Sequence, residues 1–401
     1  MKNPPTGMQL TPFNPEYLDD PYAILHALRA SDPLHHDVEL NRYFPTRYDD
    51  VRAILKDASF LTDPHSSRPE SFARHFLSEE GEEVSMLFAD GMRHRRLRLL
   101  VNDLFKPRAV EKWRARIEHV VDDYLDKLET PEFELMSGFA EPVPTVVIAE
   151  IMGIASDKQA DFKRWSEMTQ EASFNPAPSE EALKLAEEGA RQLESFFLQE
   201  ISNRREEPLD DLISLLIASE IEGDKLTDSE IVSQCVLLLL AGNLTTTDMI
   251  GNGIRALLEN PNQLDKLRRD GTLIEATVEE ILRYDGPVLN SSRITHEDTE
   301  LNGCPIKKGE CLHVSLAGAN RDPDVYERPD DFNIERKRVP HVAFGGGRHL
   351  CLGAHLARLE GQVAIQRLID RFPKLRFADR GFAQSFVPEF RGLDYCWLRS
   401  D

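Results

Sequence analysis

The chain has 401 residues, of which 41% are hydrophobic and 29% charged, a composition typical of folded globular proteins. Its formal net charge of -22 disfavours general binding to nucleic acid or to anionic membranes. The longest apolar run, 235–241, is too short to span a bilayer, and the first residues lack a signal-peptide pattern, so we expect a cytoplasmic protein without a membrane anchor.

Helical periodicity dominates the chain, and strand-like patches are short. Helices are expected at 22–30, 48–57, 92–102, 109–128, 141–152, 158–172, 179–205, 209–219, 227–258, 261–269, 272–284 and 353–371, and strands at 34–47, 290–301, 304–314 and 385–398. The polar segment 320–342 is longer than an ordinary connection, so something must hold it in place. The sequence predicts a mainly α fold with a minor β part, in a single large domain over residues 1–401.

The first helical motif, DGMRHRRLRLLV at 90–101, places His94 and Arg98 four residues apart and therefore on one helix face. Such a pair can bind one carboxylate with both side chains. The same spacing also occurs on a basic helix face that is simply exposed to solvent. The segment 93–116 holds nine Lys and Arg residues against two acids, a reversal of charge in an acidic chain. It is either a docking patch for an acidic partner or a region paired with acids of the same chain.

The segment LLLLAGNLTTTDMIGNGI at 237–254 breaks a local rule. Three consecutive threonines, Thr245 to Thr247, are unfavourable inside a helix. A broken rule in a core helix often marks a functional position, whereas threonines that hydrogen-bond back to helix carbonyls are the structural alternative.

Three further charged positions lie downstream. EEILRY at 279–284 places Glu280 and Arg283 one helical turn apart, which is a common and weak pattern on its own. Arg293 lies in SSRIT at 291–295, and Arg336 lies in FNIER at 332–336.

The segment AFGGGRHLCLG at 343–353 combines three glycines with Cys351, directly ahead of a predicted helix. A helix N-terminus offers free N–H groups and a positive dipole end, and both lower the pKa of a thiol. The glycines permit positive φ and a close approach of the backbone to a flat ligand. The alternative is a buried structural cysteine beside a flexible loop. The five widely spaced cysteines fit a reducing compartment.

FGGGRHLCLG at 344–353 resembles the haem-ligand loop of the cytochrome P450 family, F-G-x-G-x-H-x-C-L-G. The other four segments occur in the family's order, so the resemblance covers nearly the whole chain. It implies a P450-type fold that holds haem b between the 227–258 helix and the 353–371 helix, with Cys351 as the proximal iron ligand. A thiolate ligand favours O–O cleavage.

The resemblance also assigns residues. Those it implies in cofactor binding are His94, Arg98, Ala241, Arg293, Phe344, Gly345, His349, Cys351 and Gly353. Among them His94, Arg98, Arg293 and His349 match partners of the haem propionates. Glu280, Arg283 and Arg336 match a structural lock behind the haem, which would supply the missing anchor of the 320–342 segment.

On the oxygen side of the haem, Ala241 and Gly242 match small residues that let the helix open locally, and Thr245 matches the alcohol that guides a proton to dioxygen. The chain departs from the family at the preceding acid position, which is Leu244. We hypothesise that Asp248, Thr246 or a substrate-held water delivers protons instead, since Asp248 lies near the Thr245 face of a helix. A solvated or capping role is the alternative for Asp248.

By family analogy, most residues that line the substrate pocket are apolar. They are Phe72, Met86, Leu87, Leu240, Leu244, Val288, Leu289 and Asn290, together with parts of 64–89, 165–185 and 386–391. This lining predicts a lipophilic small molecule, with Asn290 available to orient one polar group.

The sequence thus predicts a haem-thiolate monooxygenase that inserts one oxygen atom from O₂ into a lipophilic substrate. Electrons would come from an acidic ferredoxin or flavodoxin that docks near 93–116, because no reductase domain is present in the sequence. Three alternatives stay open: a peroxygenase or rearrangement catalyst on the same fold, a non-catalytic haem sensor or carrier, and a helical scaffold without haem.

Overall fold

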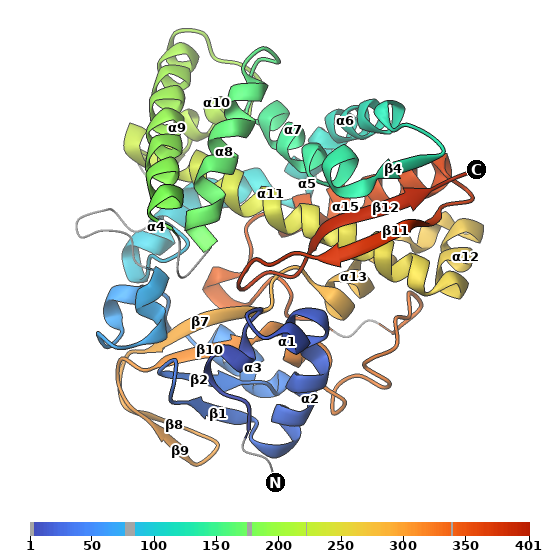
Figure 1. The fold of residues 1–401 in the computed structure, drawn as a ribbon. Helices are drawn as coiled ribbons and strands as arrows, with labels where there is room; N and C mark the ends of the chain where they lie inside the picture. Colours follow the sequence, from blue (N-terminus) through green and yellow to red (C-terminus); the bar gives the residue numbers. More distant parts are fainter. Residues whose placement is uncertain (1–3, 77–84, 175–178, 222, 338–339) are drawn as a thin grey trace. The chain divides into compact units, whose positions relative to one another are not determined.

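The computed structural model describes residues 4–76, 85–174, 179–221, 223–337 and 340–401. Its internal contacts divide into two compact units. The first comprises Met1–Asp90, Arg255–Cys351 and Gln384–Gly392, and the second comprises Gly91–Ile254, Leu352–Ala383 and Leu393–Asp401. Helices predominate over short strands, which confirms the predicted fold class (Figure 1).

The first unit is built on a five-stranded sheet in the order β1-β2-β10-β7-β3. Its strands are β1 (Leu34–Asp37), β2 (Arg42–Pro45), β3 (Phe60–Leu61), β7 (Asn290–Thr295) and β10 (Cys311–Ser315), and a separate hairpin is formed by β8 (Thr299–Leu301) and β9 (Cys304–Ile306). Strand β10 pairs with β2 in parallel and with β7 antiparallel. The helices of this unit are α1 (Pro15–Asp19), α2 (Pro21–Ser31), α3 (Tyr48–Lys56), α12 (Pro261–Arg269), α13 (Ile274–Asp285) and α14 (Leu316–Asn320).

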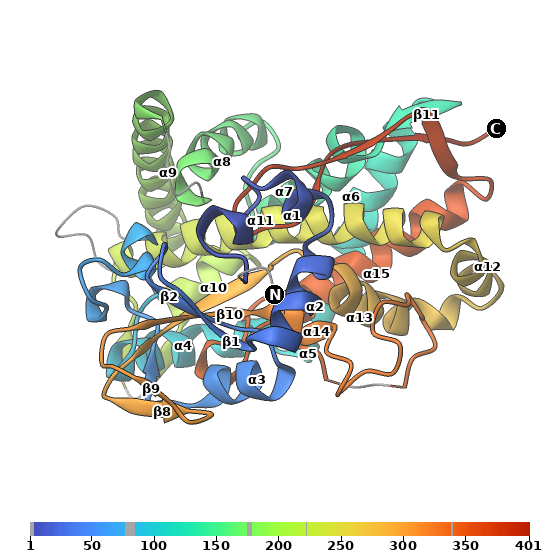
Figure 2. The same cartoon turned by 60° about the horizontal axis from the view of Figure 1, so that its bottom comes forward.

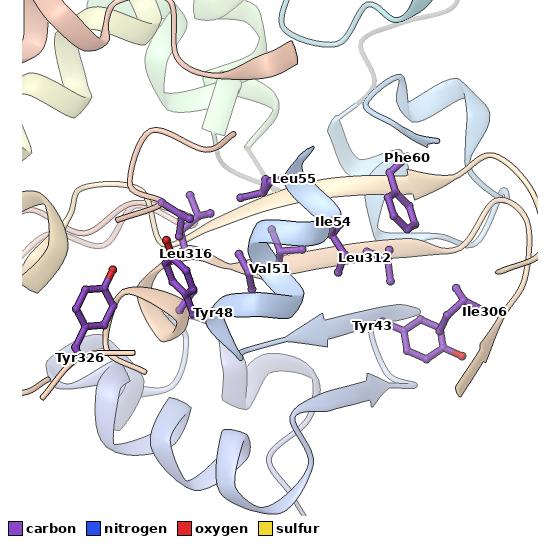
Figure 3. Close-up of a cluster of buried hydrophobic side chains, with 13 residues drawn as sticks. Tyr43, Tyr48, Val51, Ile54, Leu55, Phe60, Ile306, Leu312, Leu316 and Tyr326 are labelled. Carbon is purple, nitrogen blue, oxygen red and sulfur yellow. The ribbon is translucent and has the colours of Figure 1, made fainter. Parts of the chain in front are cut away.

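Both faces of this sheet are buried, so every residue of β2 and β10 is buried. Successive side chains of a strand point to opposite faces. Tyr43 and Leu312 therefore pack with Val51 and Ile54 of α3 on one side, as Figure 3 shows. Phe44 packs on the other side, with the apolar side chains of α1 and α2.

The second unit is mainly helical. Its helices are α4 (Gly91–Asn102), α5 (Pro107–Val110), α6 (Arg114–Lys127), α7 (Pro142–Ile151), α8 (Gln159–Phe174), α9 (Glu180–Glu206), α10 (Leu212–Ala218), most of α11 (Asp228–Glu259), and α15 (Ala354–Arg371). Its strands are β4 (Glu132–Glu134), β5 (Glu220–Ile221), β6 (Asp224–Lys225), β11 (Arg376–Gln384) and β12 (Leu393–Arg399). Helices α8 and α9 lie side by side (Figure 2), so closely that a Cβ at Gly189 would lie 2.8 Å from the Trp165 carbonyl oxygen.

The predicted helices 227–258 and 353–371 match α11 and α15 to within one residue at each end. The predicted helix 109–128 is instead divided into α5, a short 3₁₀ turn and α6. The predicted strand 385–398 is wrong in its first half, because β11 ends at Gln384 and β12 begins at Leu393. By length and composition alone α11 could cross a membrane, but a core helix meets the same test and 50% of its most apolar window is buried.

Candidate functional site

The backbone of the cysteine loop is closed by its own hydrogen bonds. The Cys351 amide donates to the Phe344 carbonyl at 3.0 Å, and the Gly345 amide donates to the Val342 carbonyl at 2.8 Å. Gly345 has a φ of +70°, which side chains other than glycine's rarely allow. The loop therefore turns back on itself between Phe344 and the cysteine. Gly353 then forms the N-cap of α15.

Two of the glycines also fit the loop against α3. Gly347 has a φ of +65°, and a Cβ added there would overlap the Leu55 carbonyl and lie 3.0 Å from the Lys56 Cα atom. Gly346 has extended backbone, and its added Cβ would lie 3.3 Å from the Leu55 Cβ atom. We expected these glycines to permit a close approach of the backbone to a flat ligand. The structure shows that Gly347 is required by approach to a helix end.

Cys351 differs from the other cysteines in its exposure. It is exposed, whereas Cys235, Cys311 and Cys396 are buried and Cys304 is half-buried, and none of the five forms a disulfide. Burial raises the pKa of the Cys235 thiol far above its ordinary value and that of Cys311 to about 11. Those two thiols stay protonated at neutral pH, so Cys351 is the cysteine best placed to act as a thiolate ligand.

Arg293 lies on β7 as a buried cation. Its Nη1 atom donates to the Ser291 hydroxyl at 3.1 Å and to the Ser292 carbonyl at 2.8 Å. Burial, opposed by Asp90 and aided by the nearby Arg348, lowers the pKa of Arg293 to about 10. A guanidinium whose charge is disfavoured by burial is stabilised by a further anion, and a carboxylate suits its fork of donors.

His349 and Asp90 form a second polar group in the same unit. The His349 Nε2 atom lies 3.1 Å from the Thr62 hydroxyl and 3.7 Å from Asp90 Oδ1. Burial lowers the pKa of His349. Burial alone would raise the pKa of Asp90, but the neighbouring His349 and hydrogen bonds from the amides of Asp63 and Thr62 lower it to about 2. Asp90 thus stays ionised beside His349 and Arg293.

These residues fit haem b. Cys351 offers an exposed sulfur, and the buried cation of Arg293 calls for the kind of carboxylate that haem carries. On α4, His94 is buried and Arg98 is half-buried, and both lie in the second unit. Their binding to a propionate stays a prediction.

The predicted oxygen-side residues all lie on α11. The Thr245 hydroxyl donates to the Ala241 carbonyl at 2.8 Å, the back-bonding that was the structural alternative. Helix α11 is continuous through Gly242, although a Cβ there would meet open space, so the expected local opening is absent from this described helix. Ala241 and Gly242, the two small residues of this segment, are both exposed.

The two proposed proton donors next to Thr245 are both buried. Thr246 is 2% exposed and Asp248 is 3% exposed, which excludes the fully solvated alternative for Asp248. Leu240 and Leu244 are half-buried on the same helix. The neighbouring Asn243 accepts a hydrogen bond from the Thr145 hydroxyl at 2.9 Å, which ties α11 to α7.

The structure brings Glu280, Arg283 and Arg336 together. Arg283 donates to both Glu280 oxygens at 2.8 Å, and the Arg336 Nε atom lies 3.2 Å from each of them. Both guanidinium groups also bind backbone carbonyls of the irregular segment, at Asn320, Glu327, Arg328, Pro329 and Asp331. This network supplies the anchor that the length of 320–342 requires.

The candidate pocket residues of the first unit differ in exposure. Phe72 and Met86 are buried, Val288 is half-buried and Leu87 is exposed. Leu289 belongs to the apolar core around Phe44, and the Asn290 amide donates to Glu389 at 3.0 Å. Parts of the predicted lining, at 77–84 and 175–178, lie outside the described residues.

Ion pairs within the chain neutralise part of the basic segment 93–116. Arg96 pairs with Asp224 and Glu230, Lys106 with Asp103, Arg114 with Glu111, and Arg116 with Asp210, at 2.5–3.8 Å. Arg93, Arg95, Arg108 and Lys112 are exposed. Pairing with acids of the same chain is therefore confirmed for part of the segment, and docking of an acidic partner stays a prediction.

The comparisons with known proteins identify the family of this chain. A family model described as Cytochrome P450 matches residues 44–375. The biotin biosynthesis cytochrome P450 of Bacillus subtilis (strain 168) is 37% identical over 94% of this chain and 96% of its own. The polyketide biosynthesis cytochrome P450 PksS of the same organism is 36% identical over 92% of each chain.

Among solved structures, the chain is similar to P450BioI in complex with acyl carrier protein ligated to hexadec-9Z-enoic acid. The TM-score is 0.86 at 35% identity, covering 96% of this chain and 100% of the other. The family match includes the helices from α3 to α15 and the cysteine loop described above. The chain belongs to the cytochrome P450 family of haem-thiolate oxidoreductases, with haem b as its cofactor.

Proposed function

We propose that this P450 is a monooxygenase that inserts one atom of O₂ into a C–H or C=C bond of a lipophilic small molecule. The observation that carries the proposal is the exposure of Cys351 at the end of the closed glycine loop. Bound haem supplies O₂ activation, which a thiolate ligand favours. The biosynthetic roles in the names of the two relatives support a small organic substrate.

The residues of this chain have three tasks in that reaction. Cys351 would ligate the iron, and Arg293 and His349, with His94 and Arg98, would bind the propionates through charge-assisted hydrogen bonds. Thr245 would pass protons. Its hydrogen is held by the Ala241 carbonyl, and its oxygen keeps lone pairs that accept a hydrogen bond from the oxygen side.

The proton supply to Thr245 differs from the family pattern, because Leu244 has no exchangeable proton. Asp248 lies three residues after Thr245 and is buried, so we propose that it holds the proton that Thr245 passes on. A carboxyl group can both accept and donate a proton, which suits it to this task.

The test of haem ligation is the spectrum of the dithionite-reduced protein with carbon monoxide. Wild type and Cys304→Ala should show the red-shifted thiolate-type Soret band, and Cys351→Ala should lose it. Cys304 is the matched control because it is half-buried in a hairpin. A thiolate-type band that survives in Cys351→Ala would reject the ligand assignment.

A peroxygenase is the second candidate, and the apolar Leu244 at the acid position favours it. Turnover is measured in two assays. The first supplies ferredoxin, its reductase and NADPH, and the second supplies hydrogen peroxide alone. Thr245 supports the monooxygenase, so we expect product in the first assay. Product in the peroxide assay alone would establish the second candidate.

We further propose that an acidic ferredoxin or flavodoxin docks on the exposed Arg93, Arg95, Arg108 and Lys112, and that the enzyme works in the cytoplasm. Complementary charge mainly raises the rate of encounter. The rate of haem reduction by ferredoxin should therefore fall as ionic strength rises, and a rate independent of salt would reject this docking site.

A further inference from the structure

Strands β2 and β10 are buried on both faces, yet each carries a polar side chain on the face opposite α3. On β2 this is Arg42, which is 1% exposed. Its Nε atom donates to Asp37 Oδ2 at 3.1 Å, and Asp37 also accepts hydrogen bonds from the Thr6 hydroxyl and the Gly7 amide. These hydrogen bonds hold the Nε side of the guanidinium in place.

The two terminal nitrogen atoms of the same guanidinium lack hydrogen-bond acceptors among the described residues. The Nη1 and Nη2 atoms of Arg42 have no hydrogen-bond partner within the part of the chain that the structure describes. The group lies over the rings of Phe72 and Phe44, 4.5 and 5.1 Å from their centroids. Buried donors without partners cost free energy, so an acceptor is expected beside them.

His313 of β10 lies against the same two aromatic rings, at centroid distances of 4.8 Å from Phe72 and 5.8 Å from Phe44. Its Nδ1 atom is 2.9 Å from the Ser292 hydroxyl. Burial lowers the pKa of His313, so the ring is neutral at pH 7. Arg42 and His313 thus contact the same two aromatic rings from two neighbouring strands.

Glu389 completes this polar group, and its backbone conformation is strained. It has a φ of +68°, a conformation that favours glycine, although the sequence there reads VPEFRG. Its Oε2 atom accepts from the Asn290 amide at 3.0 Å and lies 3.0 Å from His313 Nε2. Its side chain is 18% exposed, so the cluster reaches solvent on this side. Strained residues of this kind are frequent at functional sites.

The charges of the cluster select the ligand. Asp37 and Glu389 are both ionised. The pKa of Asp37 is lowered, and, against the effect of burial, hydrogen bonds from His313 and Asn290 and the charge of Arg42 lower the pKa of Glu389 to about 2. Two carboxylates against one guanidinium leave a net negative charge. A further anion is therefore repelled, whereas a neutral oxygen can accept the hydrogen bonds that Arg42 offers.

We propose that Arg42, Asn290, His313 and Glu389, the Arg42 cluster, bind a neutral carbonyl or hydroxyl oxygen of the substrate, and that Glu389 excludes free carboxylates. This inference rests on the proposed function only in identifying the ligand as the substrate. It assigns specificity for an uncharged over an anionic oxygen group at the far end of the molecule, apart from the haem chemistry.

The test measures binding of decan-2-one and decanoate to the haem-loaded enzyme by calorimetry. Wild type should bind the ketone at least ~10-fold more tightly than the acid, a difference of about 1.4 kcal/mol. Arg42→Lys keeps the charge beside Asp37 but lacks the fork, so its affinity for the ketone should fall ~10-fold. Imidazole binding to the haem should stay unchanged in this variant, which excludes a general loss of structure.

Glu389→Gly relieves the positive φ and removes the repelling charge. It should bind decanoate ~10-fold more tightly than wild type does. Asn302→Gly is the matched control, because Asn302 also has a positive φ, +52°, and is exposed in the β8–β9 hairpin. That variant should leave both affinities unchanged.

Equal affinities of wild type for the two ligands, or no binding of the ketone, would overturn the inference. An unchanged ratio in Glu389→Gly would also overturn it. Turnover is not measured in this test, so a failure of the proposed electron supply or reaction type gives a different result from a failure of the Arg42 cluster.

Discussion

Replacement of Gly347 by alanine is expected to destabilise the protein through two separate effects. The φ of +65° costs an L-residue ~1 kcal/mol. The new Cβ would also overlap the Leu55 carbonyl and approach the Lys56 Cα atom at 3.0 Å, so backbone must move, at a cost of ~1–3 kcal/mol. Alanine also restricts the unfolded chain more than glycine does, which stabilises the folded state by ~0.4–1 kcal/mol. The net loss is therefore ~1–4 kcal/mol.

Gly303→Ala separates the two effects. Gly303 has a φ of +80°, but an added Cβ would have no neighbour within 4 Å among the described residues. It should therefore cost less than ~1 kcal/mol. Urea unfolding of the two variants measures the difference, and the carbon monoxide spectrum reports whether Cys351 still ligates in Gly347→Ala. Equal losses in both variants would refute the argument that the loop is fitted to α3.

Three further predictions concern side chains. Asp90→Asn should lower the free energy of unfolding at neutral pH by about 2 kcal/mol, because folding lowers the carboxyl pKa from 3.8 to about 2. That stabilisation is present above about pH 4 and is lost as the pH falls towards 2, so urea midpoints of wild type and variant should converge on acidification; a constant gap would contradict the assignment. Arg336→Met should cost ~3 kcal/mol in urea unfolding by removing a partner of the buried Glu280, whereas Arg328→Met, at an arginine whose side chain is 77% exposed, should cost less than ~0.5 kcal/mol. Asp248→Asn should slow turnover and raise hydrogen peroxide release per NADPH consumed, and unchanged coupling would reject its role in proton supply.

Local patterns of the sequence predict the parts of the structure that depend on neighbours in the chain. Helices α11 and α15 follow from periodicity. The meeting of Glu280 with Arg336 was predicted only through the family resemblance, because a pair 56 residues apart leaves no local pattern.

The remaining site residues depend on contacts between distant segments. His349 meets Thr62 across 287 residues, and no spacing rule relates them. The requirement for glycine at Gly347 comes from the end of α3, which the loop sequence does not reveal. Strand β11 was missed because its residues are mostly exposed or half-buried and show no alternation.

The two edges of the five-stranded sheet are short. At one edge β1 has four residues, and at the other β3 has two. Long exposed edges recruit strands from other chains, and short ones offer too few backbone groups for stable pairing. The apolar centre of the sheet, β2 and β10, is paired on both sides within the chain. The sheet is therefore protected against strand exchange between molecules at the high concentrations reached during overproduction, and its aggregation is expected only after β1 or β3 detaches.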